Sequence, residues 1–130
     1  MNARVLLVCA DDPRRRLLED LLADLRPVVR TLGVKAADVP WSGPAPDLLV
    51  IGAFGRTALA AELARVALAA EPNLSVLAVD EAENWPEALL HRAGVSVVAL
   101  GARGGLAAAR ERLLERRALL REVSSRREAP

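Results

Sequence analysis

Cysteine and aromatic residues are scarce in this chain of 130 residues, which has one cysteine, one phenylalanine, two tryptophans and no tyrosine. The single cysteine, Cys9, excludes an intramolecular disulfide framework and a CxxC metal motif, so a reducing compartment is the default. Long hydrophobic runs are missing as well. The N-terminal apolar run, from Val5 to Ala10, is too short for a signal peptide and far below the roughly 20 residues that span a bilayer. These absences favour a cytoplasmic protein that makes no contact with a membrane.

Charge of one sign is not in excess either, because the chain has 18 basic and 17 acidic residues. The distribution is uneven, since residues 102–130 hold eight arginines and four glutamates. The interleaved glutamates and the lack of aromatic residues among these arginines argue against a nucleic-acid partner. The length and a hydrophobic content of 52% predict one domain with a substantial core over residues 1–120, followed by a basic helical extension or disordered tail over 121–130.

What the chain does have is a regular alternation of apolar runs and segments of helical period. Short, wholly apolar runs at 4–8, 47–51, 75–79 and 95–100 predict strands buried on both faces, as in a parallel sheet between helices. A weaker strand is expected at 27–34. The order predicts an α/β fold, a doubly wound (βα)5 three-layer sandwich with a five-stranded parallel sheet of the flavodoxin-like type.

Helical period is clearest in two segments. The first helix is expected to begin near Pro13, with Asp11 or Asp12 as its cap. Its apolar stripe consists of Leu17, Leu18, Leu21, Leu22 and Leu25. The alanine-rich segment 57–70 predicts a second, longer helix, whereas three prolines within residues 35–46 limit any helix there to a turn or two.

Three motifs occur at the spacing of one known family. The stretch "PDLLVIG" resembles a third strand that begins with Pro-Asp and ends in a phospho-accepting aspartate, "EPNLSVLAV" places Pro72 twenty residues after Gly52, and "HRAGVSVVALGA" resembles an Ala-Gly turn and fifth strand. Over about residues 3–118 the chain therefore resembles the bacterial response-regulator receiver domain. The resemblance implies the receiver fold and, for an active member, phosphorylation at the carboxyl ends of the strands with magnesium bound.

The residues at the phosphorylation positions do not supply that chemistry. The resemblance implies an acidic pair and a nucleophilic aspartate, but the matching positions hold Cys9 and Ala10 for the pair and Gly52 for the nucleophile. It also implies a hydroxyl group and a lysine, and those positions hold Asp80 and Gly101. Shifting the match by two residues brings Asp11 and Asp12 to the acidic positions, while Lys35 is the only lysine in the chain. Glycine has no side chain to phosphorylate, and the carboxylate of Asp80 repels a phosphoryl group. The sequence thus predicts no enzymatic activity and no cofactor.

Two glycine-rich turns follow strands at the same edge, "GAFGRT" at 52–57 and "GARGG" at 101–105. Amides at a helix N-terminus beside an arginine can bind a phosphate group or a nucleotide. The candidate anion-binding residues are Gly55, Arg56, Thr57, Arg103 and Gly104. Neither turn is a GxGxxG motif or a P-loop, and strand-to-helix turns use glycine for backbone reasons alone, so both interpretations stay open.

Single side chains at this edge also allow two interpretations each. Cys9 is either a redox sensor or a small core residue, and strand cysteines mostly belong to the core. Asp11, Asp12 and Asp80 either gather to hold a divalent ion or act separately, the first two in helix capping and solvation.

The last expected helix, from about 105 to 122, repeats leucine every seven residues and carries arginines on its flanks. Such a helix pairs with a copy of itself or continues as a solvated surface helix. A shorter helix is expected at 84–94, on the face that receivers use to bind partners. Candidate contacts are Trp85, His91, Arg110, Leu113 and Arg117, although Trp85 fits simple packing equally well and His91 reads as an ordinary helical residue.

Together these observations predict a phosphorylation-independent pseudo-receiver, a signalling module that acts through protein–protein interaction. It is expected to form a homodimer through the face made by the fourth helix, the fifth strand and the fifth helix. The alternative is a sensor that binds a small anionic or nucleotide ligand at the glycine-rich turns. An enzyme on a flavodoxin-like scaffold is disfavoured, because no pair of nucleophile and base stands at the strand ends.

Overall fold

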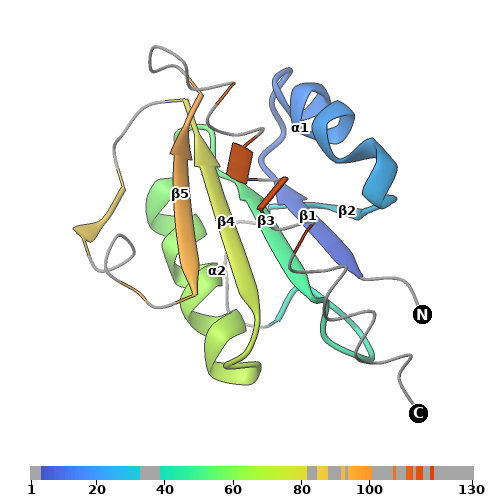
Figure 1. Cartoon of the computed structure of the whole chain (residues 1–130). Helices are drawn as coiled ribbons and strands as arrows, with labels where there is room; N and C mark the ends of the chain where they lie inside the picture. The colour runs from blue at the N-terminus through green and yellow to red at the C-terminus, as the bar shows by residue number, and fades with distance from the viewer. Residues whose placement is uncertain are drawn as a thin grey trace.

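The computed structural model describes residues 4–32, 39–81, 85–87, 92, 94–100, 107, 111–112, 114–115 and 118. In this part of the chain five strands form one sheet, and α-helices follow the first and third strands (Figure 1). The elements are β1 (Val5–Cys9), α1 (Arg15–Leu22), the short 3₁₀ helix η1 (Ala23–Leu25), β2 (Val28–Thr31), β3 (Leu48–Gly52), α2 (Thr57–Ala70), β4 (Ser75–Asp80) and β5 (Val95–Ala99).

All five strands are parallel, in the order β2-β1-β3-β4-β5. This is the flavodoxin-like order, in which the path of the chain reverses between β1 and β3. Because the β1-to-β2 and β3-to-β4 connections run in opposite directions across the sheet, right-handed crossovers place α1 and α2 on opposite faces. Figure 1 accordingly shows α2 behind β4 and β5. The expected five-stranded parallel α/β sheet is therefore confirmed.

The complete alternation of five strands with five helices goes beyond what is described. Two α-helices, α1 and α2, are complete in the described residues. The expected helices at 84–94 and 105–122 fall largely outside them, as does the expected tail at 121–130. The described stretch 39–47 contains bends but no helix, as its prolines predict. No helix of the described residues is both long and apolar enough to cross a membrane.

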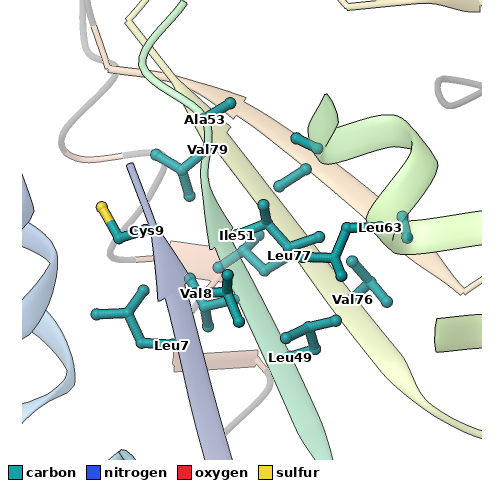
Figure 2. Close-up of a cluster of buried hydrophobic side chains, with 14 of the residues drawn as sticks. Leu7, Val8, Cys9, Leu49, Ile51, Ala53, Leu63, Val76, Leu77 and Val79 are labelled. Carbon is teal, nitrogen blue, oxygen red and sulfur yellow. The ribbon is translucent and has the colours of Figure 1, made fainter. Parts of the chain in front are cut away.

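The core lies on both faces of the three central strands, because every residue of β1 and β3 is buried, as are the last five of β4. Figure 2 shows how alternate side chains of β1 serve the two faces, with Leu7 and Cys9 on one side and Val8 on the other. Strand β2 is the exception. It is an edge strand with mostly exposed residues, which agrees with its weaker sequence signal.

Helix α1 buries a narrower stripe than its five leucines suggest. Leu18 and Leu22 are buried, Leu21 and Leu25 are half-buried, and Leu17 is 39% exposed. At about 100° per residue, Leu17 lies about 120° from the midpoint between Leu18 and Leu22, so it points away from the sheet. The expectation that Leu17 belongs to the buried stripe was wrong for this geometric reason.

Helix α2 begins and ends where the sequence predicts, at Thr57 and Ala70. Its buried face alternates small and large side chains, since Ala60, Ala64 and Ala67 are fully buried beside Leu63 and Leu68. Alanine on the inner face brings the helix close to the sheet at little loss of side-chain entropy.

The two leucines of α1 give a direct test of this packing. Replacing the fully buried Leu22 by alanine should lower the free energy of unfolding by about 2–5 kcal/mol, because it removes packed methyl groups and leaves a cavity. The matched change Leu17→Ala on the same helix should cost less than about 1 kcal/mol. Urea unfolding of both variants measures the difference, and equal losses would contradict the placement of α1.

Candidate functional site

Four of the positions that the resemblance assigned to phosphorylation, Cys9, Ala10, Gly52 and Asp80, lie at the carboxyl ends of β1, β3 and β4. Cys9 pairs with Gly52 in the sheet, and Gly52 pairs in turn with Val79, the residue before Asp80. The amide of Ala10 donates a hydrogen bond to the Gly52 carbonyl oxygen at 2.8 Å. The structure thus brings Cys9, Ala10, Gly52 and Asp80 to one edge of the sheet.

Gly52 has no room for a side chain. A Cβ atom placed on its backbone would lie 2.6 Å from the Cys9 sulfur, 2.8 Å from Cδ1 of Leu18 and 3.1 Å from Cε2 of Phe54. All three side chains are buried, and they come from β1, α1 and the loop after β3. The space that a reactive carboxylate would occupy is therefore filled by apolar side chains, and glycine is the residue that allows them to meet.

The loop after β3 holds Phe54 in place with an unusual backbone. Phe54 has φ of 42°, in the left-handed region that residues with a large side chain rarely adopt. Its ring is almost fully buried, and the guanidinium carbon of Arg14 lies 4.6 Å from the ring centroid. Burial of the ring and this cation–π contact offset the backbone strain.

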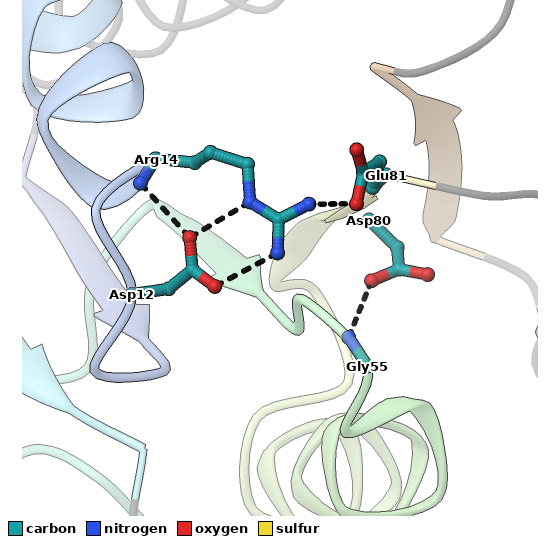
Figure 3. A network of polar contacts seen from close by, with 5 residues as sticks. All are labelled: Asp12, Arg14, Gly55, Asp80 and Glu81. Atoms are coloured by element: carbon teal, nitrogen blue, oxygen red, sulfur yellow. Dashed lines mark hydrogen bonds and ion pairs between the residues drawn. The ribbon is translucent and has the colours of Figure 1, made fainter.

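Asp80, the one buried charged residue described, points into the turn that follows β3. It is 3% exposed, and its Oδ1 accepts a hydrogen bond from the Gly55 amide at 2.8 Å (Figure 3). The turn therefore already holds an anion, which is the carboxylate of its own neighbouring strand.

Two more amides of this turn are also engaged. Ala53 donates to the Val79 carbonyl at 2.8 Å, and Arg56 donates to the Ala53 carbonyl at 3.0 Å. Arg56 is exposed and Thr57, half-buried, is the first residue of α2. The hydrogen bonds at Ala53, Gly55 and Arg56 leave little of the cradle of free amides that an anion site at 52–57 needs. Arg103, Gly104 and Gly101 lie outside the described residues.

Arg14 joins three parts of this edge, and the sequence analysis did not single it out. Its Nε and Nη2 donate to the two carboxylate oxygens of Asp12 at 2.7 and 2.8 Å, and its Nη1 pairs with the Glu81 carboxylate (Figure 3). Together with its contact to Phe54, this arginine ties the start of α1 to the end of β4 and to the loop after β3. The signal in the sequence is weak, because Arg14 lies within a run of three arginines and its partner Glu81 is 67 residues away.

These ion pairs shift the pKa values of Asp12 and Arg14. Hydrogen bonds from the Arg14 side chain and amide lower the pKa of Asp12 from its usual 3.8 to about 2. The same pairing raises the pKa of Arg14 further above its usual range. The bond from the Arg14 amide to Asp12 Oδ1, at 2.9 Å, supports the turn that leads into α1. The helix itself begins at Arg15, two residues after the expected start at Pro13, and its N-cap is Arg14 with no side-chain cap hydrogen bond, so the predicted capping by Asp11 or Asp12 was wrong.

The structure separates the carboxylates that the sequence allowed to gather around a metal ion. Asp11 is exposed, Asp12 is paired with Arg14, and Asp80 accepts the Gly55 amide. Over the described ranges, no group of three or more His, Cys, Asp or Glu side chains is placed to hold a metal ion.

Two residues with open interpretations belong to the core. Cys9 is fully buried, and burial raises the pKa of its thiol from 9.0 to about 11, so the thiolate required for redox chemistry is disfavoured. Trp85 is 8% exposed and packs in the hydrophobic core, although its Nε1 has no hydrogen-bond partner. The other candidate contacts, His91, Arg110, Leu113 and Arg117, lie outside the described residues.

The fold and this edge define a parallel α/β protein of flavodoxin-like strand order whose strand ends are filled by its own side chains. Comparison of the chain with family models, with curated proteins and with solved structures found no match.

The closed space at Gly52 predicts a clash that a second substitution relieves. Gly52→Ala should lower the free energy of unfolding by about 1–3 kcal/mol, because the new methyl group overpacks a buried site. In a Cys9→Ala background the same change should cost clearly less, since the sulfur at 2.6 Å is gone. A double-mutant cycle from urea unfolding measures this coupling, and additive losses would contradict the proximity of the two residues.

The low pKa of Asp12 predicts a defined acid sensitivity. A folded-state pKa of about 2, below the usual 3.8, adds stability that is complete above the unfolded value and is lost as pH falls through about 2. The Asp12→Asn variant should therefore lose less stability than the wild type between about pH 4 and pH 2. Unfolding midpoints in urea across this range test it, with Asp11→Asn as the matched control that should follow the wild type.

Proposed function

We propose that this chain is a receiver-like domain that works without phosphorylation, as a signalling module that acts by protein–protein interaction. The proposal includes the complete (βα)5 sandwich, with further helices at 84–94 and 105–122. The observation that carries it is the filled space at Gly52, where Cys9, Leu18 and Phe54 lie in place of a carboxylate.

The polar contacts at the same edge support the proposal. A phosphoryl group acts on a receiver by adding negative charge and hydrogen-bond acceptors at the strand ends. Here the Asp80 carboxylate already accepts the Gly55 amide, and Arg14 is shared between Asp12 and Glu81. Since each of these carboxylates already has a donor within the chain, the edge needs no phosphoryl group to complete its hydrogen bonds.

A domain that is not switched by phosphorylation binds its partner through a surface that is exposed at all times. The outer edge of β5 is such a surface in the described residues, because β5 pairs with β4 alone and lies at the end of the sheet. We place the homodimer contact on the face formed by β5 and the helices expected at 84–94 and 105–122. Trp85 is buried in the hydrophobic core, so we do not assign it a contact with the partner.

The same contacts argue against a small anion at the glycine-rich turn 52–57. The Gly55 amide is bound by Asp80, and the side chain of Asp80 adds negative charge where the ligand would sit. An anion would have to displace this buried carboxylate, which costs free energy.

The proposal is tested with magnesium and beryllofluoride, a mimic of the phosphoryl group. The melting temperature and the oligomeric mass of the purified chain should both stay unchanged when these are added, whereas an active receiver run in parallel should respond. The Gly52→Asp variant should be destabilised and should also fail to respond, because its carboxylate meets Cys9 and Leu18. A magnesium-dependent shift in either protein would show that the edge is open, and would overturn the proposal.

A further inference from the structure

A pocket of about 320 Å³ lies at the opposite edge of the sheet from Gly52. Its walls are the first residues of β1, the segment from Arg26 to Arg30 that contains most of β2, and the loop at 40–46. Three arginines, Arg4, Arg26 and Arg30, and one aromatic residue, Trp41, are among the lining residues.

In the described part of the chain, the face of the sheet edge at this pocket is lined by the loop at 40–46 and by no helix. Cys9 points to the face covered by α1, since its sulfur and Leu18 meet at Gly52. Leu6 is three residues before Cys9 and therefore points to the other face, and its sheet partner Val28 points the same way. The loop at 40–46 lines the pocket together with Leu6 and Val28. Its prolines exclude a helix, so this loop is irregular and leaves a hollow beside the two strands.

The charged residues that line this hollow are all basic, while the Asp47 carboxylate, next to the lining residue Pro46, accepts the Arg4 amide at 2.8 Å. No acidic residue lines the pocket. Ion pairs of the described residues use Arg14, Arg15, Arg65 and Arg112, and in that part of the chain Arg4, Arg26 and Arg30 pair with no carboxylate. Arg4, Arg26 and Arg30 are exposed residues that line one hollow, so their positive charges raise the potential there. This potential favours the binding of an anion.

Trp41 and the apolar lining residues indicate that a ligand of this pocket also has an apolar part. The indole of Trp41 is half-buried beside the pocket, and Leu6, Val28 and Pro44 provide further apolar surface. Val28 is 56% exposed, which is high for a strand valine. A flat ring stacks on an indole, and guanidinium groups bind phosphate by paired hydrogen bonds.

We infer that this pocket binds a small anion in which a phosphate group is attached to a flat ring system, as in a nucleoside monophosphate. The volume lies at the lower end of the range of about 300–1,000 Å³ for ligand pockets, so the ligand is a small molecule and not a polymer. The arginines hold the phosphate, and Trp41 stacks on the ring. This site is separate from the strand ends near Gly52 and does not depend on the proposed function.

Fluorescence of Trp41 tests the assignment once the second tryptophan is removed. In a Trp85→Phe background, adenosine monophosphate should change the Trp41 emission in a saturable way. Adenosine and inorganic phosphate should each bind at least about tenfold more weakly, because each lacks one of the two groups that the pocket recognises. Calorimetric titration of the unaltered chain with the same three probes checks that the background substitution has no effect on binding.

Variants of the arginines complete the test. Arg30→Gln and Arg26→Gln should each weaken binding of adenosine monophosphate by about tenfold or more. Arg16→Gln, which removes the same charge from an exposed position on α1, should leave the affinity unchanged. The assignment is overturned if adenosine monophosphate does not bind at millimolar concentration, if Arg16→Gln weakens binding as much as Arg30→Gln does, or if adenosine or inorganic phosphate binds as tightly as the nucleotide.

Discussion

The close approach of Cys9, Leu18 and Phe54 to the Cα atom of Gly52 is the constraint on which the functional edge depends. Without a side chain at Gly52, β1 and α1 pack directly over the end of β3, and Phe54 completes the contact from the loop beyond. A carboxylate at this position would separate these elements and would bring a charge into an apolar site. The absence of a single Cβ atom therefore closes the place where a parallel α/β protein of this order usually carries its chemistry.

The charged residues around Gly52 reinforce that closure. Arg14 pairs with Asp12 and Glu81 and lies over the ring of Phe54, while Asp80 accepts the Gly55 amide. Each of these groups would be a candidate for binding a ligand if it were free. Because they satisfy one another, the edge stabilises the fold and leaves recognition to other surfaces. Arg4, Arg26 and Arg30, which line the pocket beside β1 and β2, differ in that none of them forms an ion pair in the described structure.

Much of the fold could be predicted because it follows from local pattern. Wholly apolar runs identified the three central strands to within one residue, and alanine-rich helical period located α2 at Thr57–Ala70. The burial of α1 was less predictable, since Leu17 and Leu18 look alike in the sequence and only the direction of the sheet distinguishes them. Arg14 and the pocket could not be predicted at all. Arg14 meets Glu81 across 67 residues, and Arg4, Arg26 and Trp41 become neighbours only when β1, β2 and the loop at 40–46 come together.

The sequence by itself determined that the chain forms a parallel α/β sheet and that no aspartate stands at the end of its third strand, because strand burial and residue identity are both local properties. Tertiary structure alone decided what fills the space at Gly52, which partner each charged side chain takes, and where positive charge stays unbalanced. Those outcomes depend on distances between segments that are far apart in the chain. The order of the strands and the hand of their connections set these distances. The residue pattern of a single segment specifies neither the strand order nor the hand of the connections.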